Sequence, residues 1–350
     1  MARRFIFTTG TSLLGNFIKK YYDPPNIAEG VFDNRFPREI DILHTPSVRW
    51  DGFRAFHYPE MQMDKGIAWN MINTWSTIQA RESYQTAEVD SLSFLPVDPE
   101  NDEVILLASN TPPGLFCALV NANLMTQHGT PVSIWEDVLQ EHSQFPIVDW
   151  DPENEISWRP IANPLANPAI VLTINQLDPN KKTTFENQAL GNLVRSVSLL
   201  ILHAMDHNME PHVIFTGGYK ATIPFLTLVC SWMGNITMWS LYEDSKEILR
   251  IPVPKANLDS RIYRMIAGKL ALEMKQDDPY YALFSRWTSK ANYTQLSSMD
   301  PADQPFFVNH PQPNQPVQLS PMGKAFAEVL RAQLGSAYFK EELKSILSNE

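Results

Sequence analysis

Short apolar runs alternate along most of the chain with longer segments whose apolar positions recur at helical spacing. The runs predict strands at 4–9, 39–43, 104–109, 131–138, 169–174, 212–216, 236–241 and 247–252. The intervening segments predict helices at 13–22, 68–80, 114–128, 183–208 and 220–233. Strands that alternate with helices indicate an α/β fold with a Rossmann-like, mainly parallel sheet and helices on both faces.

After Pro254 the pattern changes, and helices are expected at 258–275, 280–290, 320–334 and 337–347 with an irregular stretch at 296–318. We therefore expect an α/β domain at 1–254, with insertions around 45–100 and 143–168, and a small, mostly helical domain at 255–350. Ser320 is placed to cap a helix with Pro321 at its first position, after a strand-like start. The second domain is open to three interpretations: a lid, a dimerisation element or a winged-helix-like module.

The formal net charge of −11 argues against a broad basic face for extended nucleic acid. It leaves room for a small local pocket that binds a short anionic ligand. The two cysteines, Cys117 and Cys230, lie in apolar runs and are interpreted as buried thiols, which suits a reducing cytoplasm. The apolar runs are too short for a signal peptide or a membrane span, so we expect a cytoplasmic protein without a membrane partner.

Three polar loops follow predicted strands, and in parallel sheets ligands bind beyond the carboxyl ends of the strands. The first loop offers backbone N–H groups and a helix start to an anion, the second offers hydrogen bonds to a base or ribose, and the third adds glycines and a cation. The candidate binding residues are Thr9, Gly10, Thr11 and Ser12, then Ser109, Asn110 and Thr111, and finally Gly217, Gly218 and Lys220. Each loop alone also fits an ordinary turn or a capped helix start, but the three together are more specific.

The same loops carry a resemblance to a known family. TTGTSLL at 8–14, TGGYKA at 216–221 and YEDSKEILRIPVPK at 242–255 resemble, in order and spacing, the motifs of CARF domains in accessory proteins of type III CRISPR systems. The resemblance covers about residues 4–254. It implies a homodimer in which two copies form one symmetric pocket for cyclic tetra-adenylate or cyclic hexa-adenylate, and it implies no cofactor.

Two functions of different class are compatible with this resemblance. In the first, the domain is a ring nuclease that needs no metal: a ribose 2′-OH attacks the adjacent phosphate and leaves a 2′,3′-cyclic phosphate. Ser12 would orient the 2′-OH and Lys220 would stabilise the developing charge, so these two are the candidate catalytic residues. In the second, the domain only binds the ring and controls a C-terminal effector or DNA-binding regulator.

Nuclease motifs of other kinds are weak. A HEPN ribonuclease needs an arginine and a histidine separated by four to six residues. The only match is Arg38 and His44, with five residues between them, and it lies in a predicted strand region and is interpreted as chance. Glu342-Leu343-Lys344 could belong to a metal-dependent nuclease only on a strand, but it lies in a predicted amphipathic helix.

Two further groups of side chains could bind ligands. His203, Asp206, His207 and Glu210 include histidines at the zinc-binding spacing i and i+4, yet a polar helix end is the favoured interpretation and no metal is predicted. Trp232 and Trp239 flank the elements that carry the motifs, and an adenine could stack on one of them.

Overall fold

The computed structural model describes thirteen segments of the chain: 2–10, 86–109, 112–126, 132–135, 143–145, 165–167, 169–177, 185–216, 220–241, 247–256, 258–278, 280–337 and 339–348. By its internal contacts the chain divides into two compact units. Unit 1 comprises Met1–Asp178, His212–Lys220 and Met238–Ile251, and unit 2 comprises Pro179–Pro211, Ala221–Thr237 and Pro252–Glu350. The expected domain boundary at 254 stays a prediction.

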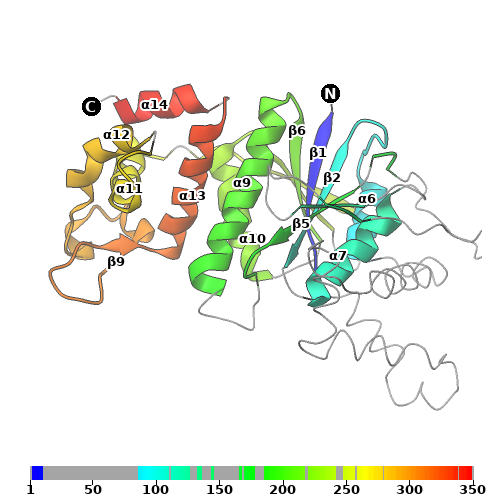
Figure 1. Ribbon diagram of the computed structural model, residues 1–350, viewed down its shortest axis with the longest axis horizontal. Helices are drawn as coiled ribbons and strands as arrows, with labels where there is room; N and C mark the ends of the chain where they lie inside the picture. Colours follow the sequence, from blue (N-terminus) through cyan, green and yellow to red (C-terminus); the bar gives the residue numbers. More distant parts are fainter. Residues whose placement is uncertain are drawn as a thin grey trace, which may run out of the picture. The chain divides into compact units, whose positions relative to one another are not determined.

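The centre of unit 1 is an eight-stranded sheet with the order β4-β3-β5-β2-β1-β6-β7-β8. Figure 1 labels its central strands β5, β2, β1 and β6. Its strands are β1 (Arg3–Thr8), β2 (Glu103–Ser109), β3 (Val132–Trp135), β4 (Ser143–Phe145), β5 (Ile170–Ile174), β6 (Glu210–Phe215), β7 (Thr237–Leu241) and β8 (Ile248–Pro252). The pairs β1–β2, β2–β5 and β3–β5 are parallel, and β3–β4 is antiparallel. The expected α/β fold with a Rossmann-like, mainly parallel sheet is confirmed.

The central strands are apolar and buried along nearly their whole length. Every residue of β5 is buried, as are all but the first residues of β1 and β2. Such continuous apolar runs are typical of strands in a parallel sheet that is covered on both faces. Within unit 1, helix α7 (Pro112–Met125) packs on β2 and β5, and α6 (Ala87–Phe94) packs on α7 (Figure 1).

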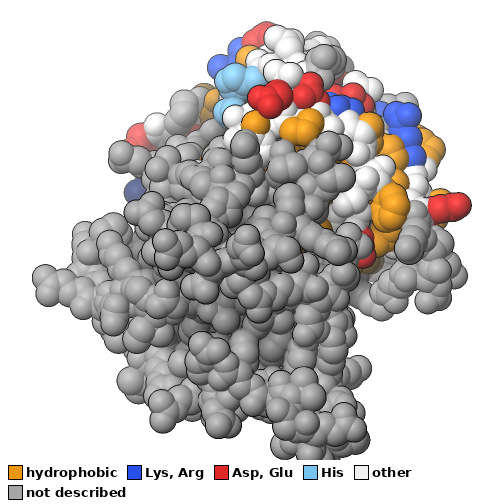
Figure 2. Space-filling model, turned by 90° about the vertical axis from the view of Figure 1, so that its right-hand side faces the viewer, with side chains coloured by type: hydrophobic (Ala, Val, Ile, Leu, Met, Phe, Trp, Pro, Cys, Tyr) orange, Lys and Arg blue, Asp and Glu red, His pale blue; other side chains and the backbone are white. Residues whose placement is uncertain are grey.

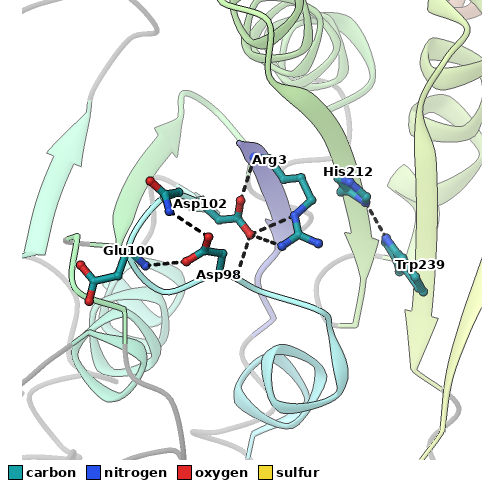
Figure 3. Close-up of polar contacts among 7 residues, drawn as sticks. Arg3, Asp98, Glu100, Asp102, His212 and Trp239 are labelled. Carbon is teal, nitrogen blue, oxygen red and sulfur yellow. Dashed lines mark hydrogen bonds and ion pairs between the residues drawn. The ribbon is translucent and has the colours of Figure 1, made fainter. Parts of the chain in front are cut away.

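Charged pairs hold the amino ends of β1 and β2 together. Asp102, which is 1% exposed, accepts hydrogen bonds from the backbone N and the Nε of Arg3 at 2.8 and 3.0 Å (Figure 3). Arg4 and Glu103 are partners in the β1–β2 register, and their side chains form an ion pair at 2.6 Å. The two arginines near the start of the chain therefore neutralise carboxylates at this edge and help to set the register of the two strands.

Unit 2 is mostly helical. Its helices are α9 (Leu190–Asp206), α10 (Ile223–Met233), α11 (Ser260–Glu273), α12 (Tyr281–Phe284), α13 (Pro321–Gly335) and α14 (Lys340–Ser348). Shorter turns are η1 (Phe185–Ala189), η3 (Ser285–Ala291), η4 (Leu296–Ser298) and η5 (Gln304–Phe306). The turn η2 (Lys220–Thr222) begins at the last residue of a unit 1 segment and continues into unit 2. The strands β9 (Phe307–Val308) and β10 (Gln318–Leu319) form an antiparallel pair before α13.

An aromatic cluster forms part of the core of unit 2. Phe326 of α13 meets Trp232 of α10 and Tyr263 of α11 edge-on, each with ring centroids 5.0 Å apart. The predicted cap of α13 is confirmed, because Ser320 Oγ accepts a hydrogen bond from the backbone N of Gly323 at 3.1 Å. No helix among the described residues is long and apolar enough to cross a membrane.

Several expected elements differ from the observed ones. The stretch 143–168, expected to be a loop, contains strand β4, and the stretch 296–318, expected to be irregular, contains β9 and the first residue of β10. The long helix expected at 183–208 begins with a π-helical turn, η1, before α9. Helix α6 was not expected, and the elements expected at 13–22, 39–43 and 68–80 lie outside the described residues.

Candidate anion-binding edge of the sheet

The carboxyl ends of four neighbouring strands meet at one edge of the sheet. In the register of the parallel pairs, Thr8 of β1 is opposite Leu107 of β2, and Ser109 of β2 is opposite Ile174 of β5. Strand β6 runs in the same direction, because its contacts with β1 advance together along both strands. His212 stacks on Phe5 near the strand starts, and the carbonyl of Ile214 accepts a long hydrogen bond of 3.4 Å from Thr8 Oγ1 near the ends. The first and third predicted loops therefore begin side by side.

Two buried hydroxyl groups mark this edge. Thr9 directly follows β1 and is 8% exposed, and Thr216 directly follows β6. Within the described part of the chain, neither Oγ1 atom has a hydrogen-bond partner, although both are shielded from solvent. A buried hydroxyl without a partner is costly, so such atoms commonly mark a place where a ligand or an ordered water completes the site.

The backbone N–H of Gly10 is bound by a buried acidic side chain. Glu88 of α6, which is 1% exposed, accepts a hydrogen bond on Oε1 from the Gly10 backbone N at 2.9 Å. Burial raises the pKa of the Glu88 carboxyl, and the hydrogen bond from Gly10 and the nearby Asn121 amide partly offset that shift. The carboxyl is therefore easier to protonate than an ordinary glutamate.

Ser109 lies against the start of α7. It is 3% exposed, and a Cβ atom placed on Gly114 would lie 1.9 Å from its Oγ, far inside van der Waals contact. Only glycine at position 114 lets the first turn of α7 approach the serine this closely. The structure thus places Ser109 at the carboxyl edge, as predicted, but also in contact with the helix that follows.

The remaining predicted site residues are only partly covered by the structure. The described residues do not include Thr11, Ser12, Asn110, Thr111, Gly217 and Gly218. Lys220 is the first residue of the turn η2, and its side chain lies outside the description. Their proposed roles stay predictions.

Sequence reasoning missed Thr216 and Glu88 as members of this edge. Thr216 could have been found, because it directly precedes the two glycines of the third loop. Glu88 gave no signal, because it contacts Gly10 across a separation of 78 residues.

The possible zinc ligands at the end of α9 have other partners. The rings of His203 and His207 stack with centroids 4.1 Å apart, and Asp206 accepts a hydrogen bond from Ser336 Oγ at 2.9 Å. Among the described residues, no three His, Cys, Asp or Glu side chains gather closely enough to hold a metal ion. Asp206 instead anchors the segment after α13.

The two tryptophans differ in their surroundings. Trp232 is 2% exposed and is packed against Phe326, so its ring is not open to an adenine, and stacking on Trp239 stays a prediction. Trp239 is half-buried, and its indole Nε1 donates to His212 Nδ1 at 2.8 Å (Figure 3).

The weak nuclease motifs gain no support. Glu342 and Lys344 lie on α14, where they form ion pairs with Lys255 at 3.0 Å and Glu341 at 2.8 Å. These are solvent-exposed pairs on a helix and not a strand-borne catalytic pair. Arg38 and His44 lie outside the described residues.

Charge on the visible surface is mixed. On the face in Figure 2, acidic and basic side chains of the described residues lie close together, with hydrophobic side chains between them. The described residues on this face form no continuous basic patch of the kind that tracks along a nucleic acid.

Residues 164–254 match the model of a family described as CRISPR-associated protein (Cas_APE2256). This segment contains β5, β6, β7 and β8 and includes the loop between β6 and η2. No curated protein matches the chain.

Proposed function

We propose that this protein acts in CRISPR defence by binding a cyclic oligoadenylate at the carboxyl edge of its sheet. The match of residues 164–254 to a CRISPR-associated family supports a role in CRISPR defence, and the matched segment includes the TGGYKA motif. The resemblance of TTGTSLL and TGGYKA to CARF motifs supports the ligand class. The protein acts as a homodimer, because a ring with two-fold symmetry suits a site formed by two copies.

The pair of buried hydroxyls at Thr9 and Thr216 is the observation that carries the proposal. They follow neighbouring strands at the edge where α/β sheets bind ligands. A hydroxyl group can donate to a phosphate oxygen, and the glycines of the adjacent loops let backbone N–H groups approach the same anion. An anionic nucleotide would complete the hydrogen bonding of both hydroxyls.

The protein then cleaves the ring without a metal. Ser12 orients a ribose 2′-OH in line with the adjacent phosphorus, and a bond forms between the 2′-oxygen and phosphorus as the bond to the 5′-oxygen breaks. The proton lost by the 2′-OH is balanced by the proton that the departing 5′-oxygen gains. Lys220 stabilises the charge that develops on the phosphoryl oxygens, and the products are linear with 2′,3′-cyclic phosphate ends.

A binding-only sensor is the second candidate. Its support is the helical segment 260–348, with its capped helix α13 and the short β9–β10 pair before it. In that case the ring is bound but left intact, and the ligand controls the C-terminal segment.

Incubation with cyclic tetra-adenylate or cyclic hexa-adenylate in the presence of EDTA, followed by chromatography of the products, separates the two candidates. Linear products with 2′,3′-cyclic phosphate ends support the ring nuclease and identify its ring size. Tight binding of an intact ring supports the sensor. Failure to bind either ring would contradict both.

A further inference from the structure

Glu88 is unusual because it is a buried acid whose described surroundings contain no counter-charge. Its polar neighbours are the N–H of Gly10, its own backbone N–H and the Asn121 amide of α7, which are all uncharged. Removing a carboxylate from water without an ion pair is costly. An apolar side chain would avoid that cost but would leave the Gly10 N–H without its acceptor, so the acid acts on this backbone group.

The position of Glu88 is well defined. It is the second residue of α6, whose first turn is capped by Thr86: Thr86 Oγ1 accepts from the Val89 backbone N at 3.2 Å and donates to Asn121 Oδ1 at 2.7 Å. The cap and the contact with α7 hold the start of the helix, so the carboxylate meets Gly10 in a fixed direction. Gly10 in turn is the second residue after the end of β1.

The carboxylate and an anionic ligand would act on the same backbone. A phosphate that accepts a hydrogen bond from the Gly10 N–H would lie close to the Glu88 charge and compete with it for that N–H. In surroundings shielded from water, repulsion between two such charges is much stronger than in bulk solvent. A proton on Glu88 would remove that repulsion and leave the carbonyl oxygen as an acceptor for Gly10.

We propose that Glu88 is a positioning residue at the carboxyl end of β1, which orients the Gly10 backbone N–H and, through its charge, sets how tightly this N–H holds an anionic ligand. This inference rests on the proposed function, since it concerns the same edge of the sheet. Ligand binding is then coupled to uptake of a proton by Glu88, and affinity falls as the pH rises.

The charged groups around Glu88 are few in the described part of the chain. The facing residues Thr86, Gly10 and Asn121 are neutral. The nearest other acid on α6 is Asp90, which is two residues further and so lies on a different side of the helix. A phosphodiester stays ionised while a carboxyl takes up or loses its proton, so Glu88 is the described group at this contact that can bind the proton.

The test is a calorimetric titration of cyclic tetra-adenylate and cyclic hexa-adenylate at several pH values between about 5 and about 8. For wild type we expect affinity to fall with rising pH, by at most about tenfold per pH unit for one proton. Glu88→Gln keeps an acceptor for the Gly10 N–H but has no charge. This variant should bind the ring more tightly than wild type at the highest pH values, and its affinity should depend little on pH. Asp90→Asn removes the same charge from the same helix and should behave like wild type.

Heats of binding for wild type measured in two buffers of different ionisation enthalpy provide a second readout that needs no variant. A difference between the buffers that corresponds to proton uptake supports the inference. If wild type binds a ring but Glu88→Gln keeps its affinity and pH slope, the inference is overturned while the proposed function stands. If wild type binds neither ring, the proposed function fails and this inference fails with it.

Discussion

The indole Nε1 of Trp239 donates a hydrogen bond to Nδ1 of His212, 2.8 Å away, across the neighbouring strands β7 and β6 (Figure 3). The imidazole is buried and stacks on Phe5 of β1 with ring centroids 4.8 Å apart. On the other side, the Arg250 guanidinium of β8 lies 5.9 Å from the centre of the indole ring. One chain of contacts thus joins four adjacent strands, and β6 among them leads into the proposed ligand loop.

Replacing Trp239 by phenylalanine keeps an aromatic ring but removes the donor to His212. We expect Trp239→Phe to lower the free energy of unfolding by about 1–3 kcal/mol, because a buried imidazole nitrogen loses its hydrogen bond. Urea denaturation of Trp239→Phe, His212→Phe and the double variant measures the coupling between the two residues. If the losses in unfolding free energy of the two single variants add up to that of the double variant, the hydrogen bond between Trp239 and His212 contributes no significant energy.

A methyl group at position 114 has no room beside Ser109. We expect Gly114→Ala to destabilise the protein by about 1–3 kcal/mol through overpacking, since the added Cβ would lie 1.9 Å from Ser109 Oγ. Gly191→Ala is the matched control, because Gly191 lies in α9 with nothing within 4 Å of an added Cβ. This change should raise the free energy of unfolding by about 0.5–1 kcal/mol, since alanine favours a helix more than glycine does. Equal effects of the two changes, measured by thermal denaturation, would argue against the close approach at Ser109.

The raised pKa of Glu88 has a consequence for stability that needs no ligand. The native protein keeps the Glu88 proton at a pH where the unfolded chain has already lost it, so the native state binds more protons in that window. The free energy of unfolding therefore falls as the pH rises from the ordinary pKa of a glutamate to the raised pKa in the fold. Glu88→Gln should remove this pH-dependent loss of stability. In thermal melts from acid to neutral pH, we therefore expect the two proteins to have similar melting temperatures at low pH and the wild type to fall below Glu88→Gln as the pH rises.

The proposed catalytic pair predicts two different phenotypes. Lys220→Ala should abolish measurable ring cleavage, a loss of at least about 10²-fold, and also weaken binding, because it removes charge stabilisation at the phosphate. Ser12→Ala should slow cleavage with less effect on affinity, because it disturbs the orientation of the 2′-OH. Single-turnover rates and binding constants separate the two effects, and unchanged cleavage in both variants would remove the assignment.

Much of the fold could be predicted because the central strands are buried on both faces. β1, β2 and β5 appear in the sequence as uninterrupted apolar runs, and the ends of these three strands lie within one residue of their predicted ends. Helix α6 could not be predicted, since its pattern is reversed: Glu88 is buried and Phe94 is 41% exposed. The polar edge strand β4 has only three residues and carries no periodic pattern.

The site residues that lie at the ends of predicted strands could be predicted from the sequence. Thr9 and Gly10 follow β1 and Ser109 is the last residue of β2, so their place at the carboxyl edge follows from the strand assignment. The contact of Glu88 with Gly10 depends on packing between distant segments, which a local pattern does not encode. Trp232 was misjudged for the same reason, because Phe326, far along the chain, covers its ring.

The central claim is that two copies of this chain bind one cyclic oligoadenylate at the carboxyl edge of the sheet. A calorimetric titration of the wild-type protein with cyclic tetra-adenylate and with cyclic hexa-adenylate, in EDTA, tests it most directly. The account predicts saturable binding of one of the rings, with one ring for every two chains. Absence of binding to both rings, or one ring bound by each separate chain, would contradict it.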